Sequence, residues 1–285
     1  MPQHVYQFTV GRIPLSVIHE GQGSWAATHA FSVPEEAWRQ SVQADARGHV
    51  TLDINIVHLS VPGHSILIDS GLGEAHPTRA HFCERFGWRE AGSLVSCLAE
   101  LGVKPEQITE VVLSHAHGDH MMGTTVERNG RRVAAFPNAK VLVMRADWEA
   151  KPGRERPGAA FDFHLPPLHE AGKLHLLDGP HEVALGVRIV PSPGETPGHV
   201  NVRVESDGQV FYYLGDLFHH PAEVGHETWS PPGRDTERLV ASRRALVAEA
   251  LREDALLMTA HMPFPGLGRL RRRDGETLWI PAARP

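Results

Sequence analysis

Short apolar runs, separated by polar and turn-forming residues, dominate this chain, and most of them have the length of β-strands. Val50–Leu59 and His64–Ile68 predict two strands joined by a Pro-Gly turn, and Val5–His19 predicts a strand or hairpin. Arg269–Ile280 predicts a last hairpin that turns at an Asp-Gly pair. Further runs that predict strands are Ile108–Leu113, Lys140–Met144, Val187–Val190, Val210–Tyr213 and Ala255–Met258.

Two segments instead repeat their apolar residues at helical spacing. Ser93–Leu101 predicts a short amphipathic helix, and Asp235–Arg252 predicts a longer one. Arg145–Ala150 predicts the start of another helix. The segment Gly21–Arg47 is expected to be irregular, and Lys151–Pro167, rich in Pro, Gly and charge, is expected to be a loop. Because strands and helices are interleaved, the pattern predicts the α/β class and nothing finer.

Length and composition fit one enzyme domain spanning residues 1–285, with residues 1–50 as an N-terminal strand and possible lid segment. Hydrophobic residues make up 41% of the chain, and the formal net charge is −6, which argues against a nucleic-acid partner. We expect no signal peptide, because the N-terminal residues lack a basic stretch followed by an apolar run, and no run approaches the ~20 apolar residues that a membrane span needs. Its two cysteines, Cys83 and Cys97, form no C-x-x-C pair. We therefore expect a cytoplasmic protein with free thiols and no membrane partner.

Candidate chemistry is concentrated directly after one of the predicted strands. His115, His117, Asp119 and His120 place four potential metal ligands within six residues, at the end of Ile108–Leu113. Imidazole nitrogens and carboxylate oxygens both suit zinc and similar divalent ions. A single buried histidine is usually structural, but this density at a strand end is hard to explain by packing. The cluster therefore predicts a metal site.

Three later residues repeat this arrangement, because each follows an apolar run and a short turn. His199 comes after Val187–Val190, Asp216 after Val210–Tyr213, and His261 after Ala255–Met258. One histidine at a strand end carries little information. Four such sites in chain order, each ending in a potential ligand, form a specific signal for a metal centre.

The full pattern resembles that of the metallo-β-lactamase superfamily of hydrolases, from about residue 55 to the C-terminus. The resemblance implies an α/β fold built as a four-layer αβ/βα sandwich, in which helices flank two mixed β-sheets. It also implies two divalent metal ions, the first bound by His115, His117 and His199 and the second by Asp119, His120 and His261, with Asp216 bridging both.

Asp69 follows the predicted strand His64–Ile68 and matches the acid of that family that orients a metal-bound histidine. Two divalent ions ~3.5–4 Å apart can share a bridging hydroxide and polarise a substrate oxygen. Zinc is the expected ion, although Mn, Co and Fe accept the same donors. The expected function is a dinuclear metal-dependent hydrolase in which Asp119 and Asp216 serve catalysis. Its expected substrate is a small lactone, ester or organophosphate ester.

Within the superfamily, the chain most resembles N-acyl homoserine lactonases and methyl parathion hydrolase-like enzymes. Lactonases place a tyrosine three residues after the bridging aspartate, whereas this chain has His219. His219 either donates a proton to a leaving-group oxygen or is an ordinary supporting or surface residue. Phe218, Trp229 and Phe264 flank the ligand loops, so they line a substrate pocket or pack in the core or a lid.

Three other interpretations stay open at this point. A mononuclear iron enzyme of the persulfide dioxygenase type shares much of the ligand set. A thioesterase similar to glyoxalase II fits less well, because the chain is predicted to end in a hairpin rather than a helical extension. A metal-free scaffold is disfavoured because all seven ligand positions are filled. Related enzymes often dimerise, so a homodimer is a further expectation.

Overall fold

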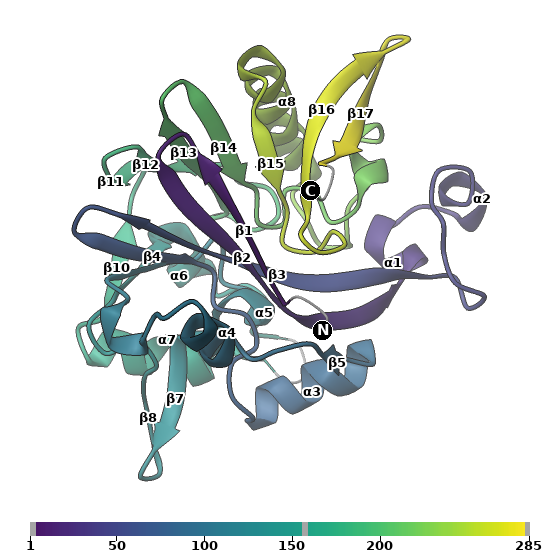
Figure 1. Ribbon diagram of the computed structural model, residues 1–285. Coiled ribbons are helices and arrows are strands. Elements are labelled where there is room, and N and C mark those ends of the chain that lie inside the picture. Colours follow the sequence, from purple (N-terminus) through teal and green to yellow (C-terminus); the bar gives the residue numbers. More distant parts are fainter. Residues whose placement is uncertain (1–3, 156–158, 283–285) are drawn as a thin grey trace.

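The computed structural model describes residues 4–155 and 159–282 and contains two mixed β-sheets packed face to face, with helices on both outer sides (Figure 1). Apolar residues of both sheets meet in the central layer, among them Val57 on one sheet and Val202 on the other. A second core lies between the first sheet and its helices, and a third lies beneath the long helix on the second sheet. The α/β class predicted from the pattern and the four-layer fold implied by the resemblance are both confirmed.

The first sheet is antiparallel at one end and parallel at the other. β1 to β4 pair antiparallel, whereas β4, β6, β9 and β10 run parallel to one another. The short strand β5 pairs with β2. The strands in spatial order are β1 (Val5–Val10), β2 (Ile13–Ala26), β3 (His49–Val61), β4 (His64–Ile68), β6 (Glu110–Val112), β9 (Lys140–Met144) and β10 (Leu174–Leu177), with β5 at Arg89–Glu90.

The second sheet follows chain order from strand to strand. Its pairs are antiparallel except for β14 and β15, which run parallel. A separate hairpin joins β7 (Thr125–Arg128) to β8 (Arg131–Ala134). The strands of the second sheet are β11 (His181–Ala184), β12 (Val187–Pro191), β13 (Val200–Ser206), β14 (Gln209–Tyr213), β15 (Leu256–Met258), β16 (Leu267–Arg273) and β17 (Glu276–Pro281).

Helices cover the outer faces of both sheets. α4 (Leu94–Glu100) and α7 (Phe161–Glu170) bury their apolar sides against the first sheet, and α8 (Thr236–Glu253) covers the second (Figure 1). Within the described part of the chain, no helix is long and apolar enough to cross a membrane. The shorter helical segments are α1 (Ala27–Phe31), α2 (Glu35–Trp38), α3 (Pro77–Phe86), α5 (Gly118–Met121), α6 (Arg145–Ala150), η1 (Pro105–Gln107), η2 (Met122–Thr124) and η3 (Pro221–Val224).

Two sequence-based expectations are wrong. Gly21–Arg47 is not irregular throughout, because β2 continues to Ala26 and α1 and α2 follow. A register shift between His19 and Gly21 interrupts the strand's periodicity and hid this continuation.

The loop expected over Lys151–Pro167 is wrong from Phe161 onward, where α7 begins. Residues 156–158 lie outside the described residues. Prolines 166 and 167 obscured the helical spacing of the residues that α7 buries. The two prolines lack the backbone N–H groups that would donate helical hydrogen bonds. Packing of the apolar face of α7 against the first sheet outweighs this loss. The buried residues of α7 are Phe161, His164, Leu165 and Leu168.

Candidate metal centre

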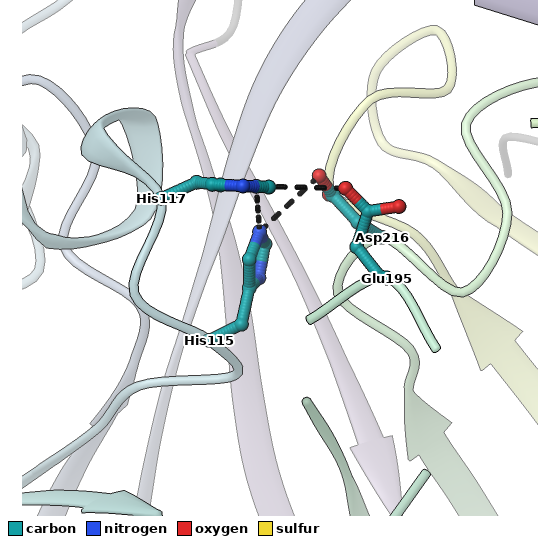
Figure 2. A group of neighbouring side chains, drawn as sticks. All are labelled: His115, His117, Glu195 and Asp216. Atoms are coloured by element: carbon teal, nitrogen blue, oxygen red, sulfur yellow. Dashed lines mark hydrogen bonds and ion pairs between the residues drawn. The ribbon is translucent and has the colours of Figure 1, made fainter. Parts of the chain in front are cut away.

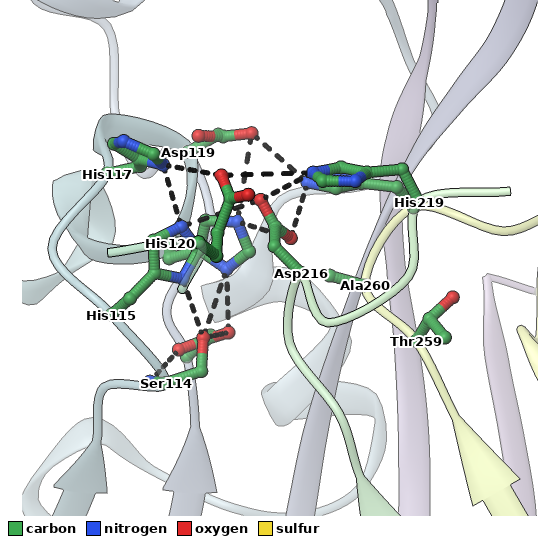
Figure 3. A network of polar contacts seen from close by, with 12 residues as sticks. Ser114, His115, His117, Asp119, His120, Asp216, His219, Thr259 and Ala260 are labelled. Atoms are coloured by element: carbon green, nitrogen blue, oxygen red, sulfur yellow. Dashed lines mark hydrogen bonds and ion pairs between the residues drawn. The ribbon is translucent and has the colours of Figure 1, made fainter. Parts of the chain in front are cut away.

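The predicted ligand residues meet at one edge of the sandwich, where strands of both sheets end (Figure 3). β6 leads into the segment from His115 to His120, whose last residues lie in α5. β14 leads to Asp216, and β15 leads to His261. Because β4, β6 and β9 are parallel, as are β14 and β15, their carboxyl ends open on the same side. The fold therefore brings together side chains that lie up to about 146 residues apart in the sequence (His115 to His261).

One group of potential ligands consists of His115, His117, Glu195 and Asp216 (Figure 2). His115 Nε2 lies 2.8 Å from His117 Nδ1 and 3.5 Å from Asp216 Oδ2. His117 Nδ1 lies 3.5 Å from Glu195 Oε1. Two imidazoles and two carboxylates thus converge on one point.

A second group consists of Asp119, His120 and His261. Figure 3 shows Asp119 and His120 close to Asp216. Asp119 Oδ2 lies 3.9 Å from His120 Nε2 and 3.5 Å from His261 Nε2. Asp216 Oδ1 faces the same two nitrogens, at 3.1 and 3.0 Å respectively. Asp216 is therefore shared by the two groups, which is the placement expected of a bridging carboxylate.

The resemblance implies that His199 binds the first metal ion, but in the structure His199 does not stand in the first group of potential ligands. Its Nδ1 donates to Ser192 O at 3.0 Å, and its Nε2 accepts from the backbone N–H of Asp216 at 3.1 Å. Both ring nitrogens are thus engaged, and Glu195 stands in the first group instead. Sequence reasoning missed Glu195, although it lies four residues before His199 in the same loop after β12. Spacing alone could not tell which side chain of this loop faces the centre.

Buried acceptors orient the ligand rings. Asp69 Oδ2 accepts from His120 Nδ1 at 2.8 Å and from the Tyr213 hydroxyl at 2.6 Å, while Asp69 Oδ1 accepts from Ser114 N at 2.7 Å. His261 Nδ1 donates to Asp53 O at 2.8 Å. These bonds turn the Nε2 atoms of both rings toward the centre, which is how proteins commonly fix a metal-bound imidazole. Asp69 thus contacts one of the expected ligand histidines, and the metal-orienting role that the resemblance implies for it stays a prediction.

Asp147, on α6, joins two ligand loops, and sequence reasoning did not identify it. Its buried carboxylate accepts from Ala116 N at 2.8 Å, from Thr196 Oγ1 at 2.9 Å and from Gly198 N at 2.6 Å. The first of these donors belongs to the loop of His115, and the other two belong to the loop of Glu195. Asp147 therefore sets the distance between the two loops.

Glycine at position 215 allows the Asp216 loop to approach the others. Gly215 has φ of +49°, and a Cβ on it would lie 2.8 Å from Ser114 Cβ and 2.9 Å from His199 Nε2. Both the left-handed backbone and the close contact exclude a larger residue at this place.

The charges at the centre favour bound cations. Burial by itself would raise the pKa of Asp216, but the surrounding imidazoles, first that of His120, hold it well below its usual range. Burial likewise opposes protonation of His120, yet the carboxylates of Asp216, Asp69 and Asp119 raise its pKa well above the ordinary value. The carboxylates thus attract positive charge, which protons supply when no metal is bound.

Two buried atoms also fit a metal centre because, among the described residues, neither has a hydrogen-bond partner. These are His120 Nε2 and Asp216 Oδ1, which face each other across 3.1 Å. Unsatisfied buried polar atoms are uncommon and call for a ligand or ion. Imidazole and carboxylate donors in two linked groups fit a pair of divalent ions.

A cavity opens over the centre, and its walls are largely apolar. Asp119, Asp216 and His261 form part of its floor. The walls include Trp25, Phe82, Phe86, Met121, Met122 and Phe161, together with one buried cation, Arg234. Such a cavity suits a small molecule that combines an apolar part with a polar reacting group.

The three aromatic residues proposed from sequence do not line this cavity. Phe218 is buried in the core beneath α8, Trp229 packs on Phe31 with ring centroids 5.4 Å apart, and Phe264 stacks on His19 at 4.9 Å. These residues neighbour ligand loops in sequence, but the loop backbone directs their side chains away from the centre. Packing in the core or against neighbouring loops is therefore their observed role.

His219 is buried at the cavity wall and is not a surface residue. Its Nε2 lies 3.2 Å from Asp216 Oδ2, and its Nδ1 lies 3.6 Å from Glu223 Oε1. Glu223 is held by Arg243, whose Nη2 lies 3.3 Å from Oε1. Burial opposes protonation of His219, but Asp216 and then Glu223 outweigh it and raise its pKa to about 10. Glu223 and Arg243 are further supporting residues that the sequence did not reveal.

Comparison with known families decides the classification. The family model described as "Metallo-beta-lactamase superfamily" matches residues 51–261. The chain belongs to the metallo-β-lactamase superfamily. The resemblance noted in the sequence is thereby confirmed.

Within this superfamily, the chain is similar to several curated proteins. An N-acyl homoserine lactonase of Bacillus cereus is 27% identical over 172 residues, which cover 60% of this chain and 63% of that protein. A lactonase of Bacillus thuringiensis is 30% identical over 172 residues, with the same coverage. Metallo-beta-lactamase domain-containing protein 1 of Xenopus laevis is 30% identical over 160 residues, 55% of this chain and 57% of that protein. The match spans less than two thirds of each relative's length.

Solved structures share the fold over nearly the whole chain. AidC, a dizinc quorum-quenching lactonase, superposes with a TM-score of 0.78 at 22% identity, covering 98% of both chains. The hydrolase AbOPH superposes with a TM-score of 0.80 at 22% identity, covering 100% of this chain and 99% of its own. At this identity the likeness establishes the metallo-β-lactamase fold.

Proposed function

We propose that this protein is a dinuclear metal-dependent hydrolase that cleaves a small lactone, ester or organophosphate ester. The observation that carries the proposal is the carboxylate of Asp216, which is shared by two groups of metal-ligating side chains beneath an apolar cavity. The lactonases among its relatives support a lactone or related ester as substrate. The shared carboxylate also favours two metal ions over the single iron of a persulfide dioxygenase.

In this proposal, the side chains of the centre have three roles: they hold the metal ions, balance charge and bind the substrate. Two bound divalent ions, of which zinc fits the donors, would lower the pKa of a water molecule toward 7 and polarise a substrate oxygen. Asp119 and Asp216 balance the charge at the floor of the cavity, and His219 presents its Nε2 beside them. Apolar walls such as Phe82 and Met122 hold an acyl or alkyl group and exclude water from the reacting atoms.

Metal content and hydrolysis together test this function. Protein purified without chelators should contain about two metal equivalents per chain, because two ligand groups are present. Dialysis against a chelator should abolish hydrolysis of at least one class in a panel of lactones, aryl esters and phosphotriesters. Zinc, manganese, cobalt or iron added back should restore it. Full activity at a stable content of one metal per chain would contradict the dinuclear mechanism.

A second experiment tests whether His219 donates a proton to the leaving-group oxygen. His219→Ala should slow hydrolysis of lactones and alkyl esters far more than that of p-nitrophenyl esters, because p-nitrophenolate leaves without a proton. Acid catalysis of this kind typically contributes ~10²–10⁴-fold. Metal content should stay unchanged, since His219 is outside both ligand groups.

His226→Ala is the matched control for this experiment. It removes an imidazole that stacks on Trp229, away from the cavity. Equal losses on both substrate types in His219→Ala would assign His219 to positioning, and unchanged rates would remove it from the mechanism.

A further inference from the structure

Glu195 is a buried carboxylate at the first ligand group, and sequence reasoning gave it no role. We propose that Glu195 is a protein ligand of the first metal ion, in the place expected for His199. As a consequence, the first position takes oxygen-preferring ions such as Mn²⁺ more readily than a three-histidine position would. The inference rests on the metal centre of the proposed function, but not on its substrate.

The geometry around Glu195 is that of a ligand. Its side chain is 0% exposed, and Oε1 lies 3.5 Å from His117 Nδ1 and 4.0 Å from His219 Nε2. Figure 2 shows Glu195 and Asp216 approaching His115 and His117 from the opposite side of the group. Both carboxylate oxygens of Glu195 are buried; Oε1 is paired with the Arg234 guanidinium, and Oε2 has no hydrogen-bond partner among the described residues. A buried carboxylate in this condition needs a cation beside it.

One such cation is Arg234, but it does not fully account for Glu195. Arg234 Nη2 pairs with Glu195 Oε1, while its Nε is buried and receives no hydrogen-bond acceptor from the part of the chain that the structure describes. A purely structural Arg–carboxylate pair is often bidentate, with two parallel hydrogen bonds. Here the guanidinium pairs through Oε1, and Oε2 makes no hydrogen bond within the described structure. Arg234 thus resembles the outer partner that holds a ligating carboxylate in place.

His199 has the contacts of a loop-holding residue. Its Nδ1 donates to Ser192 O, and its Nε2 accepts the N–H of Asp216. A metal ion at His199 Nε2 would displace this bond and leave a buried backbone N–H without its acceptor. Glu195 can bind a metal at no such cost.

With Glu195 as a ligand, the two metal positions have the same donor composition. The first has His115, His117 and Glu195, the second has His120, His261 and Asp119, and each also uses Asp216. Imidazole donors suit zinc, copper and iron, whereas carboxylates also suit manganese. Exchanging one imidazole for a carboxylate therefore moves the first position toward harder ions.

A pair of variants decides between the two residues. Glu195→Gln and His199→Gln are each loaded with zinc, and bound metal is measured by elemental analysis and by competition with a chromogenic chelator. Glu195→Gln should retain about one tightly bound zinc, whereas His199→Gln should retain two. Arg234→Met should weaken the first site by roughly 10–100-fold, the usual effect of removing an outer partner.

Glu195→His tests the consequence for metal choice. In competition between Mn²⁺ and Zn²⁺, this variant should lower the manganese share at the first position by about tenfold or more relative to the natural protein. It also keeps the test decisive if Glu195→Gln fails to fold, as judged by circular dichroism.

Several results would overturn the assignment. One is two tightly bound zinc ions in Glu195→Gln, and another is loss of one zinc in His199→Gln. An unchanged manganese share in Glu195→His would be a third. If Glu195→Gln keeps both metals and still hydrolyses substrate, this inference fails while the proposed function stands. If the natural protein binds no metal, both fail.

Discussion

Replacing Asp216 by alanine is expected to reduce hydrolysis by at least about 100-fold and to lower metal content from two ions to one or none. Losing even an outer partner of a ligand costs 10–100-fold, and Asp216 contacts both ligand groups directly. Its Oδ2 lies 3.5 Å from His115 Nε2, and its Oδ1 lies 3.0 Å from His261 Nε2. Elemental analysis and initial rates on the best substrate of the panel would measure both effects.

The fold should survive this substitution, because Asp216 lies on a loop at the sheet edge and outside the apolar cores. Circular dichroism of Asp216→Ala should therefore match that of the natural protein. Asp178→Ala removes an exposed carboxylate that pairs with Arg145, and it controls for the loss of one negative charge. If Asp216→Ala kept activity within a few-fold, the bridging role assigned to Asp216 would be wrong.

Replacing Asp147 by alanine is expected to cost about 3 kcal/mol of unfolding free energy and to weaken metal binding. The change leaves Ala116 N, Thr196 Oγ1 and Gly198 N without the carboxylate that accepts their hydrogen bonds. Hydrogen bonds to charged groups contribute about 1.5–3 kcal/mol each. Burial raises the pKa of Asp147, so the native charge is itself costly, and this offsets part of the sum.

Urea unfolding of the metal-loaded protein would measure this loss, and chelator competition would measure the metal affinity. The affinity should fall because the loops that carry His115 and Glu195 are no longer tied together. Glu149→Ala, an exposed change on the same helix α6, provides the control and should change the stability by less than ~0.5 kcal/mol. A loss below about 1 kcal/mol in Asp147→Ala would show that the loops are held by other contacts.

The strands and the histidine cluster were readable from the sequence because both depend on local patterns. The runs His64–Ile68 and Lys140–Met144 coincide with β4 and β9, since a buried strand needs a short continuous apolar run whatever its partners are. Asp235–Arg252 likewise predicts α8, because one apolar face repeats every three to four residues. The cluster of His115, His117, Asp119 and His120 was also readable, because its potential ligands lie within six consecutive residues. Recognising these features requires no knowledge of contacts between residues far apart in sequence.

Elements that depend on distant packing were not readable. α7 forms despite two internal prolines because the first sheet covers its apolar face. The walls of the cavity are another example. Phe264 faces His19 on β2, whereas Trp25 on the same strand faces the cavity, and only the path of β2 along the sandwich decides this.

The sequence by itself determined that this protein has strand ends rich in imidazole and carboxylate, because the type of each potential ligand and the spacing between neighbouring ligands can be identified from consecutive residues. Only the tertiary structure decided which of these side chains face one another. His199 and Glu195 lie on one loop, and the contacts of Ser192 and Asp216 occupy both ring nitrogens of His199, whereas Glu195 stands among the potential metal ligands. A hydrogen bond between residues far apart in sequence has no local signature. Which side chains form the first group of potential ligands therefore depends on the meeting of loops from both sheets.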